Sequence, residues 1–191
     1  MTRISAGGLL AVLLMVVSGH ALALDPSLKM SQYMLDQWQI PEGLPQNGVA
    51  SIARTPDGYL WIGTEEGLAR FDGVRFVVFD RSNETAIPSN LILVLHVDRA
   101  GRLWIGTQDG MAVLENGRFE PYNTVAGLAH VPILSILDDR MGRLWVGTAK
   151  GLVEVDQQQR GRVFGMADGL GDANIRALLE DRNGMIWVAT A

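Results

Sequence analysis

The side chains of this sequence that could do metal or acid–base chemistry are few. The histidines are His20, His96 and His130, and there is no cysteine, which excludes a thiol nucleophile and a cysteine-bound metal. Because His96 lies inside an apolar run, a packed histidine is a better interpretation than a metal ligand. His130 lies in a connection between apolar runs, where contact with a ligand is more reasonable. We therefore expect no metal site and no cofactor.

Carboxylates recur at one position of a repeated turn, and this recurrence argues against catalysis. Asp98, Asp139 and Asp181 each stand three residues before a glycine and six residues before a tryptophan. An acid–base pair is needed once per protein, whereas a turn residue is needed once per repeat. We therefore expect structural aspartates and no catalytic residue. The sequence also lacks nucleophile-elbow, phosphate-loop and zinc-helix motifs.

A sequence repeat must position these residues. The segment Trp61-Ile62-Gly63-Thr64 recurs with its tryptophan at positions 104, 145 and 187, a spacing of 41 to 43 residues. Valine replaces the isoleucine in the last two copies, and Ala189 replaces the glycine in the last one. The first copy is preceded by Thr55-Pro56-Asp57-Gly58 in place of the Asp-x-x-Gly turn. Both sequences favour a tight turn, since Asp bonds a nearby backbone N–H and Pro presets φ. A fixed period of this length dictates the architecture.

Each repeat contains four short segments with the character of strands. An apolar alternating run comes first, the tryptophan segment second, and two further segments follow at glycine turns. The first segments are 49–53, 91–97, 133–137 and 175–179, and fourth segments are 74–79 and 118–122. Four antiparallel strands with a tryptophan and glycines at fixed offsets predict an all-β fold, a β-propeller made of four-stranded antiparallel blades.

The repeats predict an incomplete ring of about three and a half blades. Their approximate bounds are 39–80, 81–123, 124–165 and 166–191. Strand alternation places Trp61 and Gly63 on one face, so we expect the indole to pack against the adjacent blade and the glycine to leave room for it. Ala189 would crowd that site slightly. The segment Tyr33 to Trp38 occupies the place of a fourth strand and would complete the last blade of a ring.

The first residues have the pattern of a secretory signal peptide. Arg3 supplies a positive charge, Leu9 to Val17 form an apolar core, and Ala21 to Ala23 form a small-residue cleavage site. A membrane anchor is the alternative, but the apolar stretch is much shorter than the roughly 20 residues of a spanning helix. We expect a signal peptide at 1–23, a mature domain at 24–191, no membrane span, and a periplasmic or secreted protein.

Composition limits the partners of the mature part. Hydrophobic residues make up 48% and charged residues 19% of the sequence, which is typical of one globular domain. The net charge is −5 and the pI about 5.1, with no cluster of Lys and Arg, so we expect no nucleic-acid partner. An open blade edge would favour self-association.

Residues in loops that differ between the repeats are the candidates for contact with a ligand, because loops carry function on a repeated scaffold. They are Glu42, Asn47, Asn90, His130 and Asn174. The tryptophans recur at one structural position, so packing between blades explains them better than stacking on a ligand.

The unit from Gly43-Leu44-Pro45 through Trp61-Ile62-Gly63-Thr64 to Asp72-Gly73 resembles the two-component regulator propeller repeat. The resemblance extends over nearly the whole mature chain. It implies an extracytoplasmic sensor of a bacterial receptor, in which a small ligand, often a saccharide, is bound. It also implies a membrane helix and a histidine kinase or diguanylate cyclase as output, parts that we do not find in this sequence.

Three functions are compatible with a propeller of this kind. The leading hypothesis is a ligand-sensing, non-enzymatic propeller domain of a signal-transduction receptor. The second is a propeller enzyme of the lyase or glycosidase type, which would need a converging cluster of arginines, carboxylates or a tyrosine. The third is a secreted scaffold for protein interaction.

Overall fold

The computed structural model describes residue 29 and residues 36–191, and the predicted signal peptide and Tyr33 lie outside them. The regular structure of the described part of the chain consists of short β-strands, with two short 3-10 turns, Ile40–Glu42 and Met166–Asp168. No helix in it is long and apolar enough to cross a bilayer. The strands are β1(Val49–Arg54), β2(Leu60–Thr64), β3(Gly67–Phe71), β4(Phe76–Phe79), β5(Ile92–Val97), β6(Leu103–Thr107), β7(Gly110–Glu115), β8(Arg118–Pro121), β9(Ile133–Asp138), β10(Leu144–Thr148), β11(Gly151–Val155), β12(Gly161–Phe164), β13(Ile175–Glu180) and β14(Ile186–Thr190).

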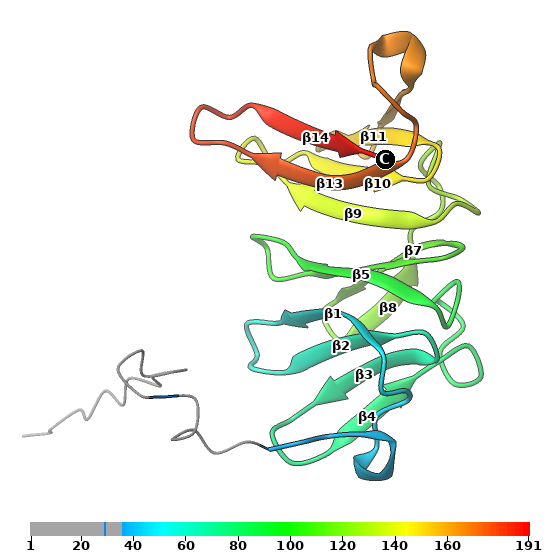
Figure 1. Ribbon diagram of the computed structural model, residues 1–191, viewed down its shortest axis with the longest axis vertical. Coiled ribbons are helices and arrows are strands. Elements are labelled where there is room, and N and C mark those ends of the chain that lie inside the picture. The colour runs from blue at the N-terminus through cyan, green and yellow to red at the C-terminus, as the bar shows by residue number, and fades with distance from the viewer. Residues whose placement is uncertain (1–28, 30–35) are drawn as a thin grey trace, which may run out of the picture. The chain divides into compact units, whose positions relative to one another are not determined.

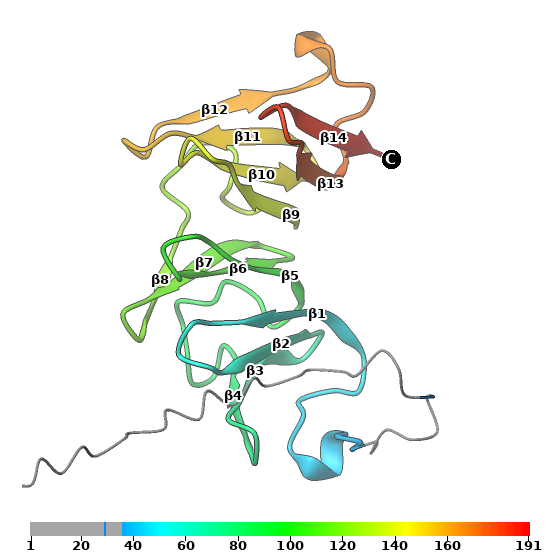
Figure 2. The same cartoon turned by 90° about the vertical axis from the view of Figure 1, so that its left-hand side faces the viewer.

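These strands form three four-stranded antiparallel sheets and one two-stranded sheet, which follow one another along the chain (Figures 1 and 2). We call them blade 1 (β1–β4), blade 2 (β5–β8), blade 3 (β9–β12) and blade 4 (β13–β14). Within each complete blade the strands pair in chain order. The first strands β1, β5, β9 and β13 lie next to one another in series. This confirms the predicted fold class.

The threonine and the glycine of the repeat close the turn between the second and third strands. In blade 1 the hydroxyl of Thr64 donates to the carbonyl of Gly67 at 2.9 Å and accepts from the N–H of Glu66 at 3.2 Å. Gly67 has a φ of 144°, which a side chain would disfavour. Thr107 and Thr148 make the same bonds in the next two blades, and all three threonines are buried.

The tryptophan face of each complete blade packs against the next blade, as predicted. Trp61 is 2% exposed and belongs to one apolar cluster with Ile92 and Leu103 of blade 2. The expected role of the glycine is corrected: a Cβ atom at Gly63 would lie 2.6 Å from Cγ2 of Ile92. The glycine therefore leaves room for the first strand of the next blade, and the indole packs beside that contact.

The two terminal segments of the repeat pattern behave differently from the central ones. Trp187 is 59% exposed, and Ala189 is exposed beside it, so no described residue is crowded by the methyl group of Ala189. Residues 36–38 do not form the strand expected from Tyr33 to Trp38. Instead, the Trp38 ring contacts the Phe71 ring edge to face, with their centroids 5.1 Å apart. The fourth segment of blade 1 begins at Phe76, two residues later than predicted.

Candidate functional site

The repeated aspartates hold the tryptophans in place through hydrogen bonds. We call the set of aspartate, arginine and tryptophan the aspartate clamp. Asp98 accepts from the indole N–H of Trp104 at 2.8 Å and from Nε of Arg102 at 2.7 Å through one oxygen. Its other oxygen accepts backbone N–H groups of its own turn. The guanidinium of Arg102 lies over the Trp104 ring, 5.0 Å from its centroid. Asp139, Arg143 and Trp145 repeat this arrangement in blade 3.

The protonation of these aspartates follows from the clamp. Burial alone would raise the pKa of Asp98, but the Trp104 indole and the N–H groups of Arg102 outweigh it and hold that pKa below the ordinary 3.8. The same balance lowers the pKa of Asp139. Both carboxylates are therefore ionised at neutral pH, and their oxygens are occupied by structural hydrogen bonds, which leaves them unsuited to acid–base work.

Blade 1 departs from this clamp. Thr55 stands in place of the aspartate, and its hydroxyl accepts from the Trp61 indole N–H at 3.0 Å. The arginine of the clamp is replaced by Tyr59. A different arginine, Arg70 on β3, lies over Tyr59 with its guanidinium carbon 4.4 Å from the ring centroid, and 5.9 Å from the Trp61 ring. The cation of blade 1 thus comes from another strand and has no aspartate beneath it.

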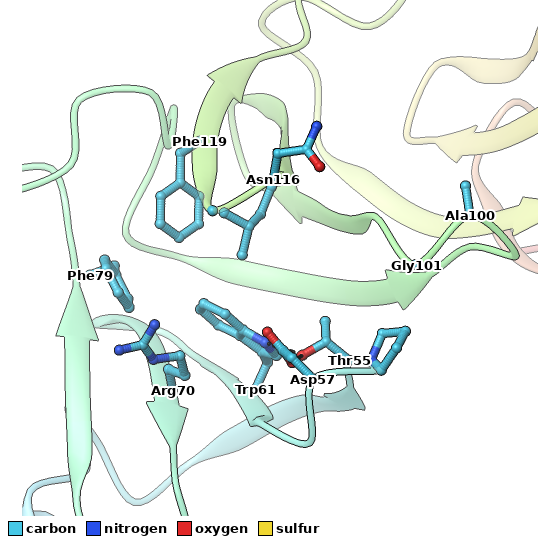
Figure 3. Close-up of a pocket in the computed structure, with 12 residues that line it drawn as sticks. Thr55, Asp57, Trp61, Arg70, Phe79, Ala100, Gly101, Asn116 and Phe119 are labelled. Atoms are coloured by element: carbon cyan, nitrogen blue, oxygen red, sulfur yellow. Dashed lines mark hydrogen bonds between the residues drawn. The ribbon is translucent and has the colours of Figure 1, made fainter.

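This departure lies at a cleft of about 380 Å³ between blades 1 and 2 (Figure 3). Arg70 and Phe79 line it from blade 1, and Asn116 and Phe119 line it from blade 2. The rings of Phe79 and Phe119 are 5.0 Å apart and form one apolar wall beside Arg70. Asp57 lines the other part of the cleft. A cation, an aromatic wall and polar groups in one concave site are features of ligand binding.

The chemistry within the cleft favours binding over reaction. The hydroxyl of Thr55 donates to Asp57 at 2.5 Å, but it also accepts the Trp61 indole N–H, so it is held as part of the packing. Sequence reasoning missed Arg70 as a residue of the cleft and Tyr59 as the ring beneath its guanidinium. The first turn of the repeat could have indicated them. There Thr55 replaces the aspartate of the Asp-x-x-Gly pattern, and without that aspartate an arginine at the position of Tyr59 would have no ion-pair partner.

The five loop residues predicted to contact a ligand lie in the connections that lead into the first strands. Three of them hold their own loops or an adjacent turn. Glu42 accepts from the N–H of Gln39 at 2.8 Å, and the amide oxygens of Asn47 and Asn90 each accept a backbone N–H at 2.9 Å. No hydrogen bond or ion pair joins any two of the five within residues 36–191.

The remaining two loop residues are less engaged. His130 is exposed, with Nδ1 3.2 Å from a carboxylate oxygen of Asp109. The side-chain oxygen of Asn174 is buried and has no hydrogen-bond partner in the described part of the chain. The structure thus places all five in the connections that precede successive blades, and their contact with a ligand stays a prediction.

His96 joins two blades. Its Nε2 lies 2.7 Å from Oδ1 of Asp138 on the first strand of blade 3, and both side chains are partly buried. Arg99 extends the contact, with its Nη1 donating to the carbonyl of Asp139 at 2.6 Å. Residues 36–191 contain no group of three or more His, Asp or Glu side chains placed to hold a metal. The geometry of His96 is that of an interblade hydrogen bond.

Comparison with solved structures places the fold in the class of β-propellers. The chain is similar to the extracellular domain of a hybrid two component system from B. thetaiotaomicron, with a TM-score of 0.70 and 19% identity over 81% of this chain and 22% of that one. The extracellular domain of a one component system from the same organism is similar with a TM-score of 0.67 and 22% identity, over 78% of this chain and 24% of that one. Virginiamycin B lyase from Staphylococcus aureus is similar with a TM-score of 0.57 and 11% identity, over 74% of this chain and 48% of that one. This chain thus spans less than half of each, and these likenesses show the fold.

The sequence itself identifies the family. Residues 43–66, 86–109, 127–150 and 169–191 match the family described as two component regulator propeller. In blades 1 to 3, each matched segment runs from the connection before the first strand to the turn that follows the second strand. The chain belongs to the two-component regulator propeller family. No curated protein matches the sequence.

Proposed function

We propose that this chain is the extracytoplasmic ligand-sensing domain of a bacterial signal-transduction receptor. The observation that carries the proposal is the cleft between blades 1 and 2, where Arg70 and an aromatic wall replace the self-contained aspartate clamp of the other blades. Membership of the family supports the proposal, as does likeness to extracellular domains of two component and one component systems. The signal-like pattern at residues 1–23 supports export. The output, a kinase or a cyclase, would belong to other parts of the receptor.

Binding at this cleft would couple a ligand to the arrangement of two blades. Phe79 and Arg70 belong to blade 1 and Phe119 to blade 2, so a ligand touching all three stabilises one relative placement of the blades. A ligand that binds only the folded state stabilises it by mass action, about 2.7 kcal/mol at a hundredfold excess over the dissociation constant. That increment is what a thermal-unfolding assay detects, whereas the placement of the blades shifts only as far as the ligand binds one placement more tightly than another.

The test has two parts. Thermal unfolding of the purified protein is measured with a panel of neutral saccharides, acidic saccharides and small organic acids, and at least one class is expected to raise the midpoint. Export is tested by fusing residues 1–40 to a reporter that is active only outside the cytoplasm. A cytoplasmic reporter, or a panel without any stabilising compound, would count against the sensor.

A second candidate function is a propeller lyase, because a lyase of the same fold is among the similar structures. Incubating any stabilising ligand with the protein and following it by mass spectrometry separates the two functions. A sensor returns its ligand unchanged, whereas a lyase yields products.

A further inference from the structure

The guanidinium of Arg70 lacks the partner that its counterparts have in the next two blades. There the stacked guanidinium of Arg102 or Arg143 forms an ion pair with an aspartate, at 2.7 and 2.6 Å. Within residues 36–191, Arg70 forms no ion pair within 4.0 Å, and its side chain donates no hydrogen bond. A guanidinium carries five N–H donors, and this one is partly buried against aromatic rings. The fold therefore leaves both a charge and its donors available for an acceptor that enters the cleft.

The second charge in the cleft limits what that acceptor can be. Asp57 lines the same space, and one of its oxygens accepts from Thr55 at 2.5 Å. A phosphate dianion next to Arg70 would be repelled by this carboxylate. A carboxylate brings a single charge and matches the planar guanidinium with two parallel hydrogen bonds. The balance of charge thus favours a monoanion.

The walls of the cleft define the body of the ligand. Phe79 and Phe119 present an apolar surface on the same side as Arg70 (Figure 3). The second carboxylate oxygen of Asp57, which accepts no hydrogen bond from residues 36–191, offers an acceptor for a hydroxyl. A volume of about 380 Å³ accommodates a ligand of ring size. A ring with an apolar face, polar edges and one carboxylate matches Arg70, the two phenylalanine rings and Asp57.

We propose that the cleft between blades 1 and 2 binds a small ring-bearing monocarboxylate, whose carboxylate pairs with Arg70 and whose ring lies against Phe79 and Phe119. This assignment rests on the proposed sensing function and names the ligand class of its site. Blade 1 is then the blade of the repeat that is specialised for binding, because the stacked arginines of blades 2 and 3 form ion pairs with their own aspartates.

Matched pairs of probes test the carboxylate. Isothermal titration calorimetry compares glucuronate with glucose, and benzoate with benzamide, on the full chain. For at least one pair the acid is expected to bind about tenfold more tightly than its neutral counterpart, the scale of a charge-assisted hydrogen bond. In Arg70→Met this ratio falls to about one, whereas Arg70→Lys retains part of it because the charge remains.

Two further variants locate the effect. Arg162→Met is the matched control, because Arg162 also stacks on a ring, 4.3 Å from the Phe164 centroid, but lies outside the cleft. It is expected to keep the wild-type ratio. Phe119→Leu is expected to weaken the acid and its neutral counterpart alike, since it alters the wall and not the cation. Urea unfolding of each variant shows that it is folded.

The outcomes separate the ligand class from the function. Equal affinity of acid and neutral probe, undiminished acid binding in Arg70→Met, or no binding of any acid overturns the monocarboxylate assignment. If neutral saccharides still stabilise the protein in those cases, the sensing role stands with another ligand class. If no compound of the whole panel stabilises it, the proposed function fails as well.

Discussion

The replacement of Gly106 on β6 by alanine is expected to disturb the contact between blades 2 and 3. A Cβ atom at this position would lie 2.5 Å from Cγ1 of Val94 and 2.8 Å from Cγ2 of Ile133. It would also lie 3.0 Å from Cβ of Ile133, which the backbone fixes. Because a rotamer change moves Cγ2 and leaves Cβ in place, relief requires the two sheets to separate.

The magnitude follows from two opposing effects. Overpacking a well-filled core costs about 1–3 kcal/mol. Alanine also restricts the unfolded chain, which returns about 0.4–1 kcal/mol at a position without backbone strain. The free energy of unfolding of Gly106→Ala is therefore expected to be about 1.3 kcal/mol below that of the wild type, which is the difference between the midpoints of these two ranges.

Urea denaturation followed by tryptophan fluorescence measures this change as a lower midpoint with an unchanged slope. Gly165→Ala is the control, because its Cβ would meet nothing within 4 Å and its φ is −129°. In an Ile133→Ala background the cost of Gly106→Ala should shrink without vanishing, since the 2.8 Å contact with Cγ2 is gone while the 3.0 Å contact with Cβ remains. Wild-type stability of Gly106→Ala, or an equal cost in both backgrounds, would refute the described contact between the blades.

Three other predictions concern the repeat. Asp139→Asn should lower the free energy of unfolding by about 2–3 kcal/mol, because the NH2 group of the amide must face either Arg143 Nε and the indole N–H or the backbone N–H groups of the turn, all of which are donors; Asp181→Asn, in the exposed copy of the turn, should lower it less. Stability should fall as the pH drops below the unfolded pKa of 3.8, since the pKa values of Asp98 and Asp139 are lowered in the folded state and the unfolded chain binds those protons first; urea midpoints from about pH 5 to 2 test this, and a flat profile over that range would contradict it. Thr148→Val should cost about 1–2 kcal/mol in the same assay by removing both hydrogen bonds of its turn; a midpoint equal to the wild type would contradict that role.

The strand content and the roles of the repeated residues could be predicted from the sequence because each depends on neighbours along the chain. The Asp-x-x-Gly turn, the Thr64 to Gly67 turn and the alternation around Trp61 involve residues a few positions apart. Repetition strengthened the inference, since one arrangement had to satisfy several copies at once. The same repetition identified the aspartates as structural, and the clamp of Asp98 bears out that interpretation.

The partners across the blades could not be predicted in this way. Alternation placed Gly63 on the face of the adjacent blade, but it did not show that Ile92, and not the indole, occupies the space. The loop residues were chosen because they differ between repeats, yet the side chains of Glu42 and Asn47 bond within their own connection. Variation along the sequence indicates where the repeat is relaxed and does not show which side chains meet.

The sequence by itself determined the repeat, the antiparallel blades and the packing role of the tryptophans, because short-range turn chemistry and strand alternation fix them. Only the tertiary structure decided the candidate site. Arg70 and Phe119 lie on different blades, and their approach depends on how two sheets pack face to face. That packing is set by the sum of many apolar contacts, such as those of Trp61 with blade 2, and no local pattern encodes it.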